Sequence, residues 1–396
     1  MGPSKTCLLV TNLFPPAIGG SSEVYAALAA HAGGEIAILT ASHDYETGLE
    51  RADWRARDRK AAYPVHRLRC IRPFLRSLPA GAVRYRLHEA AIVLTLAVTV
   101  IRLAWRYRVK AICIADDETV GWLAFLSRHF LRRRTLIYCH GDDLTGTGRV
   151  VVRRSRWFRL AHRIVAANRH AASLLTDRFG VAAEKIALIR NGVDLAVFCP
   201  GPAPQELVQR YQLGGRLVLL TVTRLVPRKG VDKVLEALPT IARQFPGALY
   251  LVVGEGPQRP ELEEMTRKLG IASHVIFAGA VPHAATRDFY NAAQLVLLPN
   301  REEAGDADGL PLIFLEANAC GKPVIGGVAG GTAEIVRDGE NGFLVDGRDP
   351  GAIAQAVCGL LADEKRRVEM GGAGLAMAQG WGWALRTQSF LETCRD

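Results

Sequence analysis

Apolar runs of strand length alternate with helical patterns along the whole chain, and this alternation starts twice. Each start has a β-rich apolar run, then a loop containing proline or glycine, then a helical pattern. The first start occupies residues 5–12, 14–20 and 23–31, and the second occupies 217–223, 224–230 and 231–245. A strand, a loop and a helix in this order open a Rossmann-like domain, so the repetition predicts two such domains.

Further short apolar runs between helical patterns predict a parallel sheet in each half, covered by helices on both faces. The additional strands are expected at 36–40, 111–114, 136–139 and 164–167, and at 249–253, 275–278, 295–298 and 323–325. The fold class is therefore α/β. Because ligands bind beyond the carboxyl ends of parallel strands, two domains facing each other across a cleft would bind their ligands there.

The chain of 396 residues is too long for one ordinary core, and a stretch rich in proline and glycine suggests where it divides. This stretch is 199–204. We expect a first domain at 1–199, a second at 200–380, and a final helix at 381–396 that packs back onto the first domain.

One apolar run departs from strand length. Ala90–Ile101 is strongly apolar and is bounded by Arg84, Arg86 and Arg102. About a dozen residues are too few to span a bilayer, which needs about 20. The preferred interpretation is a buried helix, and the alternative is an interfacial helix with basic flanks.

The charge distribution adds a possible partner to this picture. The formal net charge is +11, and residues 1–199 hold 30 Lys and Arg against 16 Asp and Glu, a balance of +14. A basic first half favours an anionic partner, such as a membrane surface or an acidic substrate, with an ordinary solvated surface as the alternative. No nucleic-acid partner is expected, because no zinc-finger spacing or RNA-binding motif accompanies the charge.

The cysteines and the N-terminus indicate the compartment. The eight cysteines form no CxxC pair and several lie in apolar runs, which predicts reduced, buried thiols. The first apolar run is too short for a signal peptide. We expect a cytoplasmic protein, with the inner face of the membrane as a further possibility.

The loop TRLVPRKG at 223–230 places two cations between a strand and a helix. Arg224 can grip a pair of phosphate oxygens, while Lys229 acts as a mobile point charge. Because the loop follows a strand at the edge where ligands bind, both cations predict a diphosphate site. Solvated surface charges are the alternative.

Two acids flank the start of a helix in DGLPLIFLE at 308–316. Asp308 is expected in the loop, with Pro311 in the first turn and Glu316 about one and a half turns into the helix. A carboxylate in an otherwise apolar helix is costly unless it has a partner. A ribose diol is a candidate partner for Glu316.

The first half has two weaker candidates. His140 follows a strand and precedes Gly141, whose small size lets a ligand approach; a satisfied loop histidine is the alternative. Gly19 and Gly20 end the first loop before a helix, where backbone N–H groups can bind a phosphate. A plain tight turn explains them equally well.

On these motifs, the chain resembles the retaining GT-B glycosyltransferases of glycosyltransferase family 4. Residues 216–346 carry most of the resemblance. In order they hold TRLVPRKG, the loop Gly254-Glu255-Gly256-Pro257, FAGAV, DGLPLIFLEANACGKPVI, GGTAEIV and DGENGFLV. The first half resembles the family more loosely, through PPAIGG, HGDD and RNGVD.

The resemblance implies a role for each matching residue of the second domain. Arg224 and Lys229 would bind the donor diphosphate and stabilise the departing nucleotide, and Glu316 would hold the ribose. Asp308 would hold hydroxyls of the donor sugar. The remaining donor-binding positions are Gly254, Glu255 and the backbone of Gly309, Leu310, Pro311 and Leu312.

In the first domain, the resemblance implies that His140 contacts the sugar near the reacting carbon, while Gly19 and Gly20 approach the diphosphate. His140, Arg224, Lys229 and Asp308 would then form the catalytic set. Asp308 departs from the family pattern, in which the first acid is usually Glu.

The implied activity is retaining glycosyl transfer from a nucleotide sugar, with cations and helix N-termini rather than a cofactor stabilising the leaving group. Asp306 and Asp308 form a DxD pattern typical of metal-dependent transferases, but Asp308 already has a role, so no metal is expected. The stretch 300–327 resembles mannosyltransferases that act on phosphatidylinositol mannosides. GDP-mannose is therefore the first donor expected, UDP-sugars remain open, and the acceptor is lipid-linked or a glycan. A sugar-nucleotide epimerase and a non-catalytic sugar-nucleotide-binding protein of the same fold are the alternatives.

Overall fold

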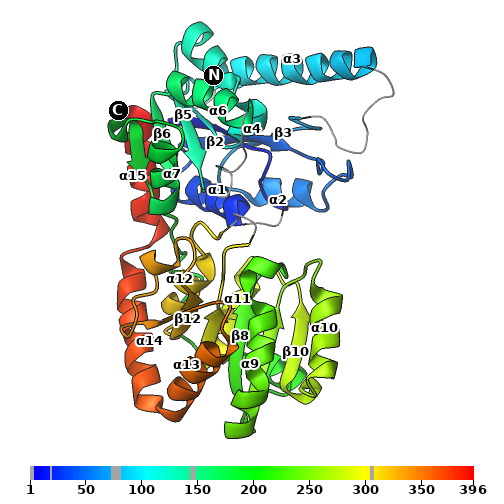
Figure 1. Cartoon of the computed structure of the whole chain (residues 1–396). Helices are drawn as coiled ribbons and strands as arrows, with labels where there is room; N and C mark the ends of the chain where they lie inside the picture. The colour runs from blue at the N-terminus through cyan, green and yellow to red at the C-terminus, as the bar shows by residue number, and fades with distance from the viewer. Residues whose placement is uncertain (1–3, 18–19, 73–81, 142–143, 145–148, 304–306) are drawn as a thin grey trace. The chain divides into compact units, whose positions relative to one another are not determined.

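The computed structural model describes residues 4–17, 20–72, 82–141, 144, 149–303 and 307–396. The chain divides into two compact units, each built around a parallel sheet (Figure 1). Unit 1 comprises residues 1–191 and 383–396, and unit 2 comprises residues 192–382. The two Rossmann-like domains predicted from the repeated strand–loop–helix pattern are confirmed.

Unit 1 contains, among the described residues, seven parallel strands in the order β3-β2-β1-β4-β5-β6-β7. Strands β1, β2 and β4 are buried along their whole length, which explains their unbroken apolar sequences. The strands are β1 (Cys7–Val10), β2 (Ile36–Ala41), β3 (Val65–Leu68), β4 (Ala111–Ile114), β5 (Arg134–Cys139), β6 (Arg163–Ala166) and β7 (Ile186–Leu188).

Helices cover both faces of this sheet. Helices α3, α5, α6 and α7 share one apolar core with the strands, and α1 and α2 lie on the other side of the sheet (Figure 1). The helices are α1 (Gly20–His31), α2 (Trp54–Lys60), α3 (Ala82–Arg106), α4 (Asp117–Val120), α5 (Leu123–Phe125), α6 (Arg149–Leu160) and α7 (Arg169–Asp177).

Unit 2 contains, within the part of the chain that is described, six parallel strands in the order β10-β9-β8-β11-β12-β13. They are β8 (Leu217–Val222), β9 (Ala248–Val253), β10 (Val275–Gly279), β11 (Leu295–Leu298), β12 (Val324–Gly327) and β13 (Gly342–Val345). In both units the strand order reverses beside the first strand, and ligands bind at such reversals, outside the carboxyl ends of the strands.

Two apolar cores, one on each side of the sheet, hold the helices of unit 2. One contains residues of α9, α10 and α13, and the other contains residues of α11, α12 and α14. The helices are α8 (Gln205–Arg210), α9 (Val231–Gln244), α10 (Arg259–Lys268), α11 (Thr286–Ala292), α12 (Leu312–Ala319), α13 (Pro350–Ala362) and α14 (Glu364–Gln379).

The units divide earlier in the sequence than the expected boundary at 199–200. The chain enters unit 2 at Gly192, because Val193 and Phe198 are buried in the core of that unit. It returns to unit 1 after Gly382, and helix α15 (Trp383–Arg395) packs against α1.

An ion pair joins α15 to the turn before β2. The Nη2 atom of Arg395 lies 2.5 Å from Oε2 of Glu35, and the hydroxyl of Thr6 donates to the same oxygen. The hydrogen bond from Thr6, and then that from Arg395, lower the pKa of Glu35 below its ordinary value of 4.5. The carboxylate is therefore ionised in the folded chain under mildly acidic conditions.

Helix α3 is not the buried helix preferred for Ala90–Ile101. One face is buried in the core of unit 1, with Leu96 and Val100 each 1% exposed. The opposite face is open, with Leu94 65% and Val98 55% exposed. A nearly continuous apolar run places apolar side chains on every side of a helix, but only one side can pack against the sheet. The buried-helix interpretation is therefore wrong for the outer face of α3.

Candidate functional site

The loop between β8 and α9 carries the two cations predicted to bind a diphosphate. Arg224 is exposed, whereas Lys229 ends a short 3-10 turn and is largely buried. Gly230 follows with a φ of 72°, and a Cβ atom there would lie 2.1 Å from the carbonyl oxygen of Pro299. Only glycine fits this turn, which fixes the start of α9 beside the end of β11.

Asp308 connects this loop to the loop before α12. Its Oδ1 atom lies 2.6 Å from Nζ of Lys229 and also pairs with the guanidinium of Arg228. The side chain is 7% exposed, and its Oδ2 atom is buried without a hydrogen-bond partner among the described residues. Because an unsatisfied buried acceptor costs about 1–3 kcal/mol, a hydroxyl donor from a ligand would be stabilising at Oδ2.

Glu316 is 7% exposed in the middle of α12, where the neighbouring side chains are apolar. The Nε2 atom of His283 lies 2.7 Å from its Oε1, and the hydroxyl of Tyr290 donates to its Oε2 at 2.6 Å. Burial and the charge of Glu316 raise the pKa of Tyr290, so the phenol keeps the proton that it donates. The protein itself therefore supplies partners for the buried carboxylate.

The contacts with His283 and Tyr290 do not use every acceptor position of the Glu316 carboxylate. Each carboxylate oxygen can accept two hydrogen bonds, so Oε1 and Oε2 each have one acceptor position beyond those used by His283 and Tyr290. The ring of Phe198 packs against both partners, with centroid distances of 5.2 Å to His283 and 5.9 Å to Tyr290. This packing restricts the rotation of both donors and hence of the carboxylate.

Neighbouring loops approach the strand ends so closely that only glycine fits. Gly254, after β9, has a φ of 135°, and a Cβ atom there would lie 1.8 Å from the carbonyl oxygen of Thr223. Gly331, after β12, would place a Cβ atom 1.9 Å from the carbonyl oxygen of Gly309. Gly254 therefore has a structural reason to be glycine, apart from its predicted contact with the donor.

The other predicted residues of unit 2 lie around the same loops. Glu255 forms an ion pair with Arg259 at the start of α10, and its side chain is 51% exposed. Leu310 is buried in the core of unit 2, Pro311 caps α12 and Leu312 is its first residue. Leu310 is 8% exposed, so its side chain offers little surface to a ligand.

In unit 1, His140 follows β5 and is 8% exposed. Its Nε2 atom lies 2.8 Å from the hydroxyl oxygen of Tyr25, which in turn lies 3.2 Å from the carbonyl oxygen of Ala115. The amide of Asn168 donates to the His140 carbonyl oxygen at 2.7 Å and fixes the backbone.

The glycines predicted before α1 are described only in part. Gly19 lies outside the described residues. Gly20 is the exposed first residue of α1, and an added Cβ atom would meet nothing within 4 Å. Tyr25 belongs to the same helix, so α1 links this predicted loop to His140.

Sequence reasoning missed four residues that organise these loops. Arg228 lies between the two chosen cations, yet only the folded chain shows its contact with Asp308. His283 and Tyr290 lie in none of the motifs found in the sequence. Buried Asn300 holds the loop after β12, because its Oδ1 accepts from the backbone of Gly327 and from the hydroxyl of Thr332, each at 3.1 Å, and its Nδ2 donates to Ala329.

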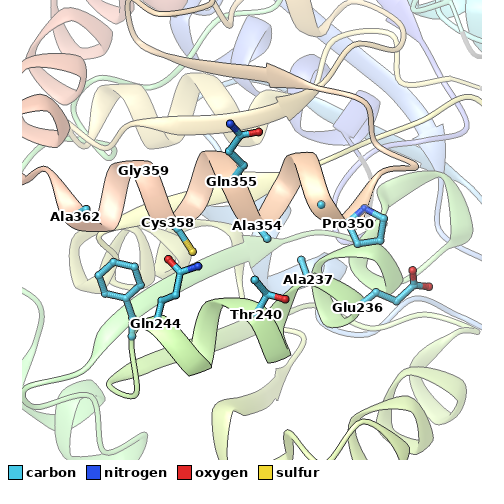
Figure 2. Close-up of a pocket in the computed structure, with 12 residues that line it drawn as sticks. Glu236, Ala237, Thr240, Gln244, Pro350, Ala354, Gln355, Cys358, Gly359 and Ala362 are labelled. Carbon is cyan, nitrogen blue, oxygen red and sulfur yellow. The ribbon is translucent and has the colours of Figure 1, made fainter.

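A separate groove of about 590 Å³ lies between α9 and α13 (Figure 2). Its lining includes small side chains such as Ala237, Ala354 and Cys358, together with Glu236 and Thr240. Its described lining includes none of the residues predicted to bind the donor, so this groove is not the candidate site.

Comparison with known proteins identifies relatives along the whole chain. The model of the glycosyl transferases group 1 matches residues 205–376, and that of glycosyltransferase family 4 matches residues 21–197. The GDP-mannose-dependent alpha-(1-6)-phosphatidylinositol monomannoside mannosyltransferase of Mycolicibacterium smegmatis is 32% identical over 395 residues, 97% of each chain. The D-inositol 3-phosphate glycosyltransferase of Acidothermus cellulolyticus is 34% identical over 64% of this chain and 57% of its own.

Solved structures show the same fold. HepE of Anabaena, crystallised in complex with UDP, has a TM-score of 0.79 and 20% identity over 98% of this chain and 99% of its own. The sucrose-phosphate synthase of Thermosynechococcus elongatus has a TM-score of 0.73 and 21% identity over 99% and 98%. The fold is that of the GT-B glycosyltransferases. With relatives that match almost its entire length, the chain belongs to glycosyltransferase family 4, the group 1 glycosyl transferases, and is an enzyme of glycosyl transfer from a nucleotide sugar.

Proposed function

We propose that this enzyme transfers mannose from GDP-mannose to a lipid-linked acceptor, with retention at the anomeric carbon and without a bound metal. Two relatives that match nearly the whole chain, from Mycolicibacterium smegmatis and Corynebacterium glutamicum, are named as GDP-mannose-dependent mannosyltransferases of phosphatidylinositol mannosides. UDP-sugars are the second donor class and a glycan the second acceptor class.

The contact between Lys229 and Asp308 carries the proposal. Two motifs that are 79 positions apart meet at a distance of 2.6 Å, and one buried oxygen of the acid stays available to a ligand. An ammonium group suits a phosphate oxygen, and a carboxylate oxygen suits a sugar hydroxyl. A sugar diphosphate carries both groups on adjacent atoms, which is the chemistry of a nucleotide-sugar donor.

The proposed reaction breaks the bond between the anomeric carbon and a diphosphate oxygen, and the electron pair stays on the diphosphate. Lys229 and Arg224 stabilise the charge that develops on this leaving group. The acceptor hydroxyl forms the new bond from the face that the diphosphate leaves, so the configuration is retained. Its proton passes to the departing phosphate oxygen, which lies on that same face.

Side chains of the protein already balance the charge of Asp308. Arg228 and Lys229 both contact this carboxylate. Their positive charges do here what the charge of a bound metal ion would do. We propose that the diphosphate is neutralised in the same way, by Lys229, Arg224 and the N-terminus of α12.

The test is a panel of nucleotide sugars offered with a phosphatidylinositol mannoside acceptor. We expect release of GDP from GDP-mannose, an α-linked lipid product and unchanged turnover in EDTA. Lys229→Met should abolish transfer, whereas Lys268→Met, at an exposed lysine of α10, should not. Release of UDP from UDP-sugars, without release of GDP from GDP-mannose, would overturn the assignment of the donor. A strict requirement for a metal would overturn the proposed metal-free mechanism. An epimerised donor without transfer would favour the epimerase alternative.

A further inference from the structure

Helix α3 of unit 1 presents an apolar stripe to solvent. Leu87, Leu94, Val98 and Trp105 are 66%, 65%, 55% and 68% exposed. Their spacing of seven, four and seven positions places them along one line of the helix, about 27 Å long. The opposite face is buried in the core of unit 1 through Ile92, Leu96, Val100 and Leu103.

Arginines border this stripe at both ends of the helix. Arg86 lies near its first residue, and Arg102 and Arg106 lie beside Trp105 near its last turn; all three arginines are exposed. At 3.6 residues per turn, Arg86 falls on one side of the stripe and the other two on the opposite side. Apolar side chains with tryptophan and arginine at the border are typical of helices that lie in a membrane interface.

The same helix is long and apolar enough to cross a bilayer, with a mean hydropathy of 1.7 in an 18-residue window within Arg86–Arg106. Crossing would require the buried face to leave the core of unit 1, including Leu96 and Val100, which are 1% exposed. Exposing these side chains would remove the stabilisation that their burial gives to unit 1. The helix therefore suits a position along a surface rather than across it.

A lipid bilayer and a second copy of the chain are the two partners considered for the stripe. The charge around the stripe favours the bilayer. Two copies paired through α3 would bring arginines and two strongly basic halves together, since residues 1–199 carry a balance of +14. Like charges repel at such a contact, whereas a surface of anionic lipid attracts them.

We propose that the outer face of α3 docks the enzyme on an anionic lipid bilayer, with the stripe below the headgroups and the arginines among them. Docking on the bilayer does not itself depend on the proposed function. Only its purpose does, which is to bring the enzyme to a lipid-linked acceptor.

The test compares vesicle binding of two matched double variants. Leu94→Glu with Val98→Glu changes the stripe, and Leu385→Glu with Val368→Glu changes a leucine and a valine of similar exposure on α15 and α14. Both pairs add the same charge at exposed positions, where substitutions rarely affect folding. Binding is measured by co-sedimentation with vesicles of phosphatidylcholine alone or mixed in equal parts with phosphatidylglycerol, at low and high salt.

We expect the wild type to bind the mixed vesicles in low salt, and the stripe variant to bind at least ~10-fold more weakly. The control pair should stay within about twofold of wild type. Equal binding by both variants, or no binding by the wild type, would overturn the proposal. So would a wild-type dimer in light scattering that only the stripe variant dissociates. GDP release measured in parallel separates the two proposals, because vesicle binding without release contradicts only the proposed function.

Discussion

Replacing Glu316 by glutamine, while the ribose of the nucleotide is altered in parallel, tests whether this acid holds the donor. Both ribose hydroxyls can donate to the carboxylate, one to Oε1 and one to Oε2, beside the bonds from His283 and Tyr290. Glutamine has nearly the same shape but offers a single acceptor oxygen. Because the Tyr290 hydroxyl can turn and accept from the amide, the variant should remain folded.

The magnitude follows from the number of hydrogen bonds. A hydrogen bond to a charged group contributes about 1.5–3 kcal/mol, so two at the lower bound give about 3 kcal/mol, or ~150-fold in Kd. The wild type should therefore bind GDP ~150-fold more tightly than 2′,3′-dideoxy-GDP. In Glu316→Gln one bond is lost and the other becomes uncharged, so this ratio should fall to ~10-fold or less.

Isothermal titration of both nucleotides against both proteins measures the four dissociation constants. Glu340→Gln, at an exposed glutamate of the same unit, provides the control and should keep the wild-type ratio. Tyr290→Phe keeps the charge of Glu316 but removes one of its donors, and should give an intermediate ratio. Equal affinity of the wild type for GDP and the dideoxy nucleotide, or an unchanged ratio in Glu316→Gln, would refute the assignment of the ribose to this residue.

Three further predictions concern other parts of the chain. Asp308→Asn should leave GDP affinity unchanged or tighter while turnover falls by ~100-fold or more, because this acid is proposed to hold the sugar and not the nucleotide; a matching loss of GDP binding in titration would contradict this. Gly254→Ala should lower the free energy of unfolding by more than ~2 kcal/mol in thermal melts, because its Cβ would lie 1.8 Å from a carbonyl oxygen. Gly359→Ala, at an open position of α13, should be neutral or slightly stabilising, and equal melting temperatures for the two variants would refute the reasoning. The pKa of Glu35 is lowered in the folded chain, so its contribution to stability is present above pH 4.5 and is lost as the pH falls through the lowered value. Glu35→Gln should therefore melt below wild type at neutral pH but not in acid, and a difference that does not change with pH would argue against it.

Much of the fold could be predicted because its central strands are buried on both sides. The predicted strands at 111–114 and 295–298 have the same bounds as β4 and β11. Strands β3, β7 and β13 were not among those predicted. They lie at sheet edges and are only partly buried; β3 (VHRL) mixes polar and apolar residues, and β7 (IAL) and β13 (GFLV) are very short. In α3, apolar content identified the helix but could not show which face the core would leave open.

Some residues of the candidate site could be proposed from the sequence, but their contacts could not. Spacing and chemistry identified Asp308, Glu316 and Lys229. The donors to Glu316 lie 33 and 26 positions away, at His283 and Tyr290, and neither stands in a motif. Which side chains compensate a buried carboxylate depends on how α11 and the turn before it pack beside α12, and this information is absent from any one segment.

The placement of α15 has a consequence for biosynthesis. Phe390 and Cys394 are fully buried in unit 1, yet a ribosome makes them only after the whole of unit 2. At 5–20 residues per second, translation of residues 192–382 separates the two parts of unit 1 by about 10–40 s. During that interval the surface of α1 that α15 later covers is open to water and to chaperones. The nascent chain can thus complete unit 2 before unit 1, which lacks α15 until residues 383–396 have been made.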